Sequence, residues 1–142
     1  MRTSEMTEAA VPQRRIGRSV LALLAGFVVN IALSLATDVG MQAAAVMPVL
    51  GQEAMNDFQS ALAVFYRTIY CVISSYVVAR LAPNRPMGHA LIGAGIGMVI
   101  ATLGAIVTWN KGLGPHWYPL VLIALALPTG WIGGKLRLMQ MR

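Results

Sequence analysis

The chain has 142 residues, of which 57% are hydrophobic and only 11% are charged, and its formal net charge is +6. A soluble domain usually carries about 25% charged residues, so this composition excludes that class and indicates an integral membrane protein. The length suffices for one domain. Four apolar runs predict an all-α fold with four membrane-spanning helices, at residues 19–37, 60–79, 90–109 and 117–134. Each is close to the ~20 residues that a helix needs to cross a bilayer, and their continuous apolar character excludes a β-barrel.

Residues 1–16 are polar and predict a flexible cytoplasmic tail before a transmembrane domain at residues 17–137. Basic residues before the first run and small residues after it also fit a cleaved signal peptide. The run of 19 residues at 19–37 exceeds the usual ~7–15 of a signal peptide, so we favour a retained first span. Good helix formers after this run predict that the first helix continues towards Pro48. Residues 138–142 form a short basic tail.

The second run contains one permanently charged side chain, Arg67. At 1.5 Å per residue, Arg67 lies ~19 Å from the basic anchor Arg80, and Asn30 lies ~18 Å from Arg18. Asp38 lies ~30 Å from Arg18, near the outer boundary. We therefore predict an intramembrane polar cluster of Asp38, Arg67 and Asn30, in which the arginine reaches Asp38 and its lower donors bond Asn30 or a backbone carbonyl. Such pairing removes most of the ~2.5–3.5 kcal/mol cost of an isolated charge.

This polar cluster has two interpretations. It either holds the first two helices together or lines a path for an ion, a proton or an anionic solute. The structural interpretation is favoured, because a path needs polar groups at every depth, and the hydroxyls below Arg67 often bond their own helix. Those scattered hydroxyls belong to Ser34, Ser74, Ser75 and Thr129.

Small residues recur at four-residue spacing in the third and fourth runs, which predicts close helix contacts. The predicted packing residues are Gly93, Gly97, Ala101, Gly104, Gly130 and Gly134. Their contacts lie either within one bundle or at a seam between two copies. The first is favoured, because four helices in one bundle must meet each other.

Basic residues lie close to one set of span ends: Arg2, Arg14, Arg15, Arg18, Arg80, Arg85, Lys135, Arg137 and Arg142. The opposite connections contain only Lys111. By the positive-inside rule both termini are expected in the cytoplasm, and short connections favour an up-down four-helix bundle. The positive charge is thus assigned to topology and to lipid headgroups, with the bilayer as partner and no nucleic acid.

No motif for catalysis is recognised, so we expect neither an enzyme nor a cofactor. His89 and His116 fall at opposite faces of the membrane and cannot share a metal. Three methionines between residues 41 and 55 offer thioethers, which favour Cu(I), but their spacing matches no ligand pattern and we expect no metal site. The single Cys71, inside the second run, is expected to act as a small apolar residue.

Five segments resemble a group of small, uncharacterised four-span bacterial membrane proteins: YRTIY, ARLAPNRPMGHA, GAIVTWN, WYPLVL and WIGGKL. The resemblance covers about residues 35–136. It implies a location in the bacterial inner membrane and a four-helix unit, and it implies no activity. The first span lacks the glutamate expected of small multidrug exporters, and the charge bias differs from that of dual-topology fluoride channels.

Two functional hypotheses follow from these features. The first is a structural or accessory protein that binds a larger membrane protein, favoured by the small-residue stripes and the small extramembrane parts. The second is a homo-oligomeric transporter or channel that uses the Asp38, Asn30 and Arg67 cluster, since four helices alone rarely enclose a route. Transport predicts self-association into a homodimer or a larger ring, whereas the accessory hypothesis predicts that a different protein is bound.

Overall fold

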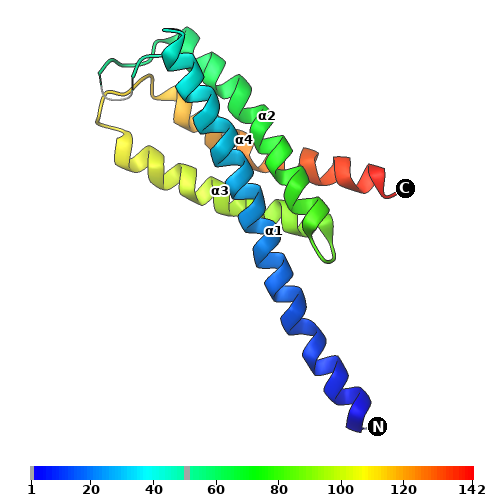
Figure 1. Cartoon of the computed structure of the whole chain (residues 1–142). Helices are drawn as coiled ribbons and strands as arrows, with labels where there is room; N and C mark the ends of the chain where they lie inside the picture. Colours follow the sequence, from blue (N-terminus) through cyan, green and yellow to red (C-terminus); the bar gives the residue numbers. More distant parts are fainter. Residues whose placement is uncertain (1, 50–51) are drawn as a thin grey trace.

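The computed structural model describes residues 2–49 and 52–142, with side chains from residue 16 onward. In these parts of the chain, helices follow one another with short connections (Figure 1). They are α1 (Arg2–Ala43), α2 (Asp57–Leu81), α3 (Pro86–Thr108) and α4 (Trp117–Gln140). All four are long and apolar enough to cross a membrane, and they pack as an up-down bundle. The predicted all-α four-helix fold is therefore confirmed, and the protein is a multi-pass membrane protein.

The ends of α1 differ in part from the sequence expectation. α1 begins at Arg2, so its first turns include residues for which the sequence predicts a flexible tail, and that statement about mobility stays a prediction. The helix continues past residue 37, as expected, and ends at Ala43. Ala45 then adopts a φ of 58°, which is left-handed backbone and cannot continue a right-handed helix. This turn ends α1 before Pro48 is reached.

The starts of α2 and α3 follow from local chemistry. Asn56 Oδ1 accepts a hydrogen bond of 2.8 Å from the Gln59 backbone N–H, and Gln59 Oε1 accepts one of 3.1 Å from the Asn56 N–H. This capping box satisfies two backbone donors that a helix start leaves free. α3 begins with Pro86 at its first turn, where the missing N–H of proline costs nothing. The α2–α3 connection can therefore be a tight turn.

α2 and α4 form the centre of the bundle. α2 contacts the other three helices, and α4 contacts α2 and α3. α1 packs on α2, approaches α3 at few positions, and within the described residues has no close approach to α4. Gly93 of α3 faces Leu23 of α1, near the point where Figure 1 shows these helices crossing before they separate towards the α1–α2 and α3–α4 connections. α1 and α3 are thus flanking helices that diverge.

Close packing in this bundle relies on small residues. A Cβ atom added at Gly130 would overlap with Ala94, and one at Gly134 would lie 2.8 Å from Met87 Sδ, so both predicted glycines lie at the α3–α4 contact. Gly26 and Gly133, which the sequence analysis did not single out, lie at the α1–α2 and α2–α4 contacts. Small residues let helix backbones approach where lipid supplies no hydrophobic force.

Two of the predicted packing residues have a different environment. A Cβ atom at Gly97 or at Gly104 would meet nothing within 4 Å. These two glycines do not pack against a neighbouring helix of the same chain. The regular spacing of small residues marks one smooth face of α3. Gly97 and Gly104 belong to the part of this face that α1 does not cover.

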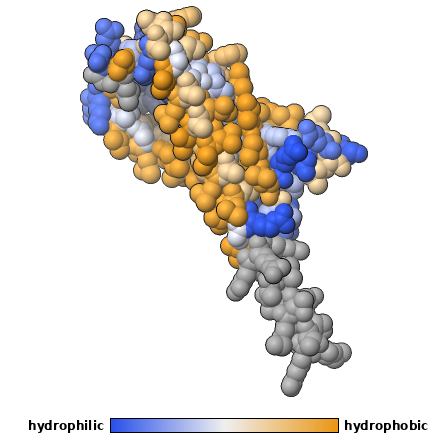
Figure 2. Space-filling model, in the orientation of Figure 1, coloured by the Kyte–Doolittle hydropathy of each residue, from blue (hydrophilic) through white to orange (hydrophobic). Residues whose placement is uncertain are grey.

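The outer surface of the bundle suits a bilayer. Figure 2 shows hydrophobic residues over the middle of the visible face and hydrophilic residues at its ends. Large apolar side chains such as Val28, Phe65 and Ile106 are exposed, and in a membrane they contact lipid. The buried core instead contains mainly small side chains, including Ala63, Ala79, Ala90 and Ser60.

Candidate functional site

The polar centre of the structure joins α1 to α2 through Asp38. Arg67 Nη2 donates a hydrogen bond of 2.7 Å to Asp38 Oδ2, forming an ion pair. The Tyr66 hydroxyl donates to the other carboxylate oxygen, Asp38 Oδ1. Consecutive residues of α2 therefore satisfy both oxygens of one carboxylate on α1. The side chains of Arg67 and Asp38 are 32% and 26% exposed, so a ligand can still reach the pair.

A second contact lies beside this ion pair. The hydroxyl oxygens of Thr37 on α1 and Tyr70 on α2 are 2.6 Å apart and share a hydrogen bond. The rings of Tyr66 and Tyr70 lie 5.8 Å apart. Together these contacts fix the rotation of α1 relative to α2 near the end of the bundle that holds the α1–α2 and α3–α4 connections.

Asn30 lies away from the ion pair. Its Nδ2 atom faces Cys71 Sγ at 4.0 Å, and among the described residues no hydrogen bond joins Asn30 to Arg67. The reason is the direction of side chains in a helix, which lean towards its N-terminus. Asp38 lies towards the N-terminal end of α2, so Arg67 extends towards Asp38, whereas Cys71, one turn later, lies opposite Asn30. The predicted cluster is thus divided between two levels.

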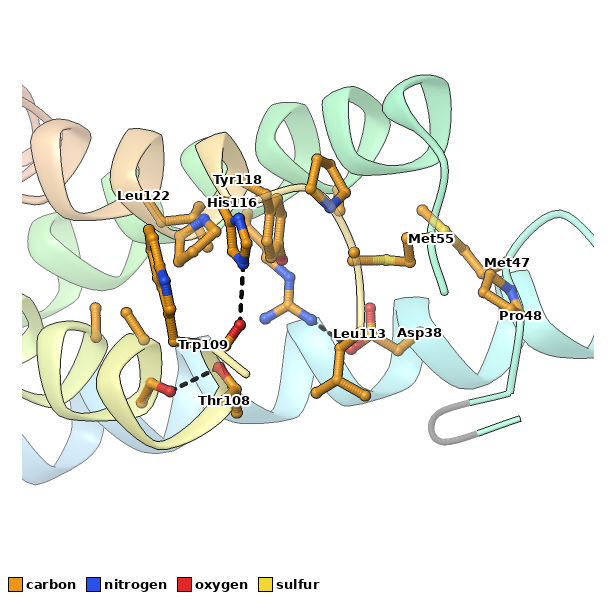
Figure 3. Close-up of a pocket in the computed structure, with 18 of the residues that line it drawn as sticks. Asp38, Met47, Pro48, Met55, Thr108, Trp109, Leu113, His116, Tyr118 and Leu122 are labelled. Carbon is orange, nitrogen blue, oxygen red and sulfur yellow. Dashed lines mark hydrogen bonds and ion pairs between the residues drawn. The ribbon is translucent and has the colours of Figure 1, made fainter. Parts of the chain in front are cut away.

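A cavity of about 370 Å³ lies next to the ion pair. We call it the outer cavity, and the end of the bundle with the α1–α2 and α3–α4 connections the outer end. Asp38, Glu53 and Arg67 are its charged lining residues. Figure 3 shows Trp109, His116 and Tyr118 in the same cavity, while Met55 and Asp38 lie towards the other end of the view. The cavity combines charged groups with aromatic and thioether surfaces.

His116 belongs to this cavity and is held in place by Trp109. The two rings are stacked with centroids 4.3 Å apart, and His116 Nε2 lies 3.0 Å from the Trp109 carbonyl oxygen. His89 lies in the first turn of α3, at the opposite end of the bundle, and its Nε2 lies 2.8 Å from Ser19 Oγ of α1. Within the described residues, no group of three His, Cys, Asp or Glu side chains is arranged to hold a metal.

An inner cavity of about 390 Å³ adjoins the outer one. Arg67, Ala101 and Leu122 line both. The inner cavity follows α1 from Leu23 to Ser34 and is lined on α3 by the predicted packing residues Gly93, Gly97 and Ala101. Gly104 lines the outer cavity. We call the two adjoining cavities together the α1–α3 groove.

The inner part of the α1–α3 groove is apolar in character. Ile31 of α1 and Ile100 of α3 line it and are each 56% exposed, so it opens towards lipid. Ser34 and Ser75 line it without a hydrogen bond among the described residues, and the other three hydroxyl groups bond backbone carbonyls. Of these three, Ser74 Oγ donates to the Gly26 carbonyl at 2.8 Å, and Thr129 Oγ1 donates to the Leu125 carbonyl at 2.8 Å. These groups offer little to a passing ion.

The fold and the site define a four-helix, multi-pass membrane protein with a lateral groove that is charged at its outer end and apolar further in. Comparison with protein-family models, curated proteins and solved structures finds no match. The resemblance to small four-span bacterial membrane proteins therefore stays a prediction. A functional proposal has to start from the geometry of the groove.

Proposed function

We propose that this protein is a structural or accessory component of the bacterial inner membrane, which acts by holding a hydrophobic partner in the α1–α3 groove. The observation that carries this proposal is the separation of α1 from α3 along an apolar, lipid-facing surface. If the groove were empty, the side chains that line it would lose their dispersion contacts on that side. In a bilayer it is filled, and whatever fills it contacts three or four helices at once.

The glycines of α3 support this role for the groove. Gly97 and Gly104 line it, and neither has a neighbour that a Cβ atom would meet. Within a single chain these glycines serve no close helix contact. Their small size keeps the α3 wall of the groove smooth and accessible to a partner.

Gly97→Leu is expected to displace the partner and to leave the bundle folded, because the new side chain enters open space inside the groove. Gly95→Leu is the matched control, since Gly95 also has no neighbour within 4 Å but lines neither cavity. Particles are extracted from native membranes into lipid discs, and native mass spectrometry gives their mass and composition. Retention of every bound component by the Gly97→Leu particle would contradict the proposal.

The termini are proposed to lie in the cytoplasm. The basic residues cluster at one end of the bundle, where the span ends near both termini and the α2–α3 connection lie, and such clusters usually face the cytoplasm. Reporter fusions active on only one side of the membrane test this at the C-terminus and at Lys111. Cytoplasmic activity at the C-terminus and external activity at Lys111 are expected. The opposite pattern would overturn the orientation.

Transport is the second candidate function, and one observation favours it. The two cavities meet at Arg67 and together follow the bundle from the outer connections to Ala90 in the second turn of α3. The bonded hydroxyls of the inner cavity count against an ion path. Reconstituted vesicles distinguish the two functions: transport predicts solute flux above that of protein-free vesicles and an oligomeric particle, and the accessory function predicts neither.

A further inference from the structure

We propose that the molecule held in the α1–α3 groove is a zwitterionic phospholipid with an ammonium headgroup. Its phosphate lies on Arg67, its ammonium group on Glu53, and one acyl chain along the inner cavity. This inference rests on the proposed function and names the partner of that same groove.

The charges of the outer cavity select the headgroup. Asp38 is already satisfied by Tyr66 and Arg67. A guanidinium has five N–H donors, and the exposed third of the Arg67 side chain lines the cavity, so donors remain for a phosphate. Glu53 is exposed and has no ion pair or hydrogen bond among the described residues. Asp38 and Arg67 compensate each other's charge, so the cavity offers one uncompensated anionic group, Glu53, together with the remaining N–H donors of Arg67.

A headgroup with both charges satisfies both groups. An anionic lipid would place further negative charge beside Glu53, and a cationic amphiphile would leave the remaining donors of Arg67 without an acceptor. The rings of Tyr66, Tyr118 and Trp109 line the same cavity, and aromatic faces attract an ammonium group. The outer cavity therefore complements a zwitterion better than a single charge.

The level of this cavity suits a headgroup. Trp109 follows the last residue of α3, and Tyr118 lies in the first turn of α4. Tryptophan and tyrosine at helix ends gather at the boundary between hydrocarbon and headgroups. Arg67 reaches this level because its side chain extends towards the outer end of α2.

The inner cavity has the length of an acyl chain. It follows α1 from Leu23 to Ser34, a rise of ~17 Å at 1.5 Å per residue. Half of a ~30 Å hydrocarbon core, which one acyl chain spans, is ~15 Å. The size of the cavities also favours a lipid over a helix from a second protein. Each cavity has a volume in the ~300–1,000 Å³ range of small-molecule sites. A helix with its side chains is ~10–12 Å wide and would need more space than this.

The test uses the full chain in lipid discs that contain equal amounts of phosphatidylethanolamine, phosphatidylcholine and phosphatidylglycerol. After transfer to detergent, native mass spectrometry measures which lipid each particle retains. Retention of phosphatidylethanolamine is expected to exceed that of phosphatidylglycerol by about tenfold, which corresponds to 1.4 kcal/mol. Equal retention of the three lipids, or a preference for phosphatidylglycerol, would overturn the proposal.

Two variants locate the lipid. Glu53→Gln is expected to reduce the preference for phosphatidylethanolamine over phosphatidylcholine, because a primary ammonium donates hydrogen bonds to a carboxylate and a quaternary one has no N–H to donate. Gly97→Leu is expected to abolish retention, and Gly95→Leu to behave as wild type. If Gly97→Leu released a bound polypeptide and no lipid, the lipid inference would fail while the proposed function stood. If it released nothing, both would fail.

Discussion

Asp38→Leu is expected to lower the free energy of unfolding by about 2.5 kcal/mol, because Arg67 would keep its charge inside the membrane without its partner. The cost of an isolated charge at a helix centre is ~2.5–3.5 kcal/mol. The lower end applies here, because Asp38 lies near the end of α1 and not at its centre, and because the Asp38 and Arg67 side chains are 26% and 32% exposed. Equilibrium unfolding in mixed micelles measures the change.

The double variant Asp38→Leu with Arg67→Leu provides the control. Removing both charges leaves no unpaired ion, so it is expected to recover most of the stability that the single variant loses. A double variant as unstable as Asp38→Leu would show that the pair acts through something other than charge. Tyr66→Phe isolates the second contact with Asp38, and its cost is expected to be ~1.5 kcal/mol, the lower end of the net value of a hydrogen bond to a charged group.

The same double variant separates structure from function. If it folds but no longer retains a partner in the α1–α3 groove, the ion pair contributes to binding as well as to packing. If it folds and retains the partner, the pair only holds α1 on α2. Arg67 is the more informative of the two residues because it lines both cavities.

Gly133→Ala is expected to destabilise the bundle by about 3 kcal/mol, near the upper end of the usual cost of overpacking. The new Cβ atom would lie 2.6 Å from Ser75 Cβ and 2.7 Å from both the Tyr76 backbone N and the Val72 carbonyl oxygen. Two of these three atoms are backbone of α2, so only a separation of α2 from α4 makes room.

Gly95→Ala is the matched control for this change. Gly95 lies inside α3 and has no neighbour within 4 Å, and alanine is favoured over glycine in a helix by ~1 kcal/mol. Unfolding in the same micelles should show a Gly95→Ala variant at least as stable as wild type. Similar losses for both variants would mean that helix propensity, not the α2–α4 contact, decides the outcome.

The fold was predictable because its determinants are local. Continuous apolar runs fix the number of spans, and short connections fix their alternation. The contact between Asp38 and Arg67 was also predictable, because the rise per residue gives the depth of each side chain and an intramembrane charge needs a partner. For the lower donors of Arg67 the sequence left Asn30 and a backbone carbonyl open. Asn30 faces Cys71 in the structure, because depth alone does not include the direction in which Arg67 extends.

The groove was not predictable from the sequence. Spacing marks the small-residue face of α3, but it does not say that Gly93 meets α1 while Gly97 faces open space. Gly133 was missed because Gly130 and Gly134, four residues apart, better matched the expected motif. Glu53 and His116 lie in or beside connections, whose conformations bring them to one cavity in a way that no periodic pattern encodes.

In the bundle, α1 packs closely against α2 and approaches α3 at few positions. α2, α3 and α4 contact one another without it, so a three-helix unit can assemble before α1 takes its final place. Afterwards the width of the groove depends on the tilt of this one helix about its contacts with α2. Exchange of a molecule bound in the groove would then require only a change in the tilt of α1, while the other three helices keep their packing.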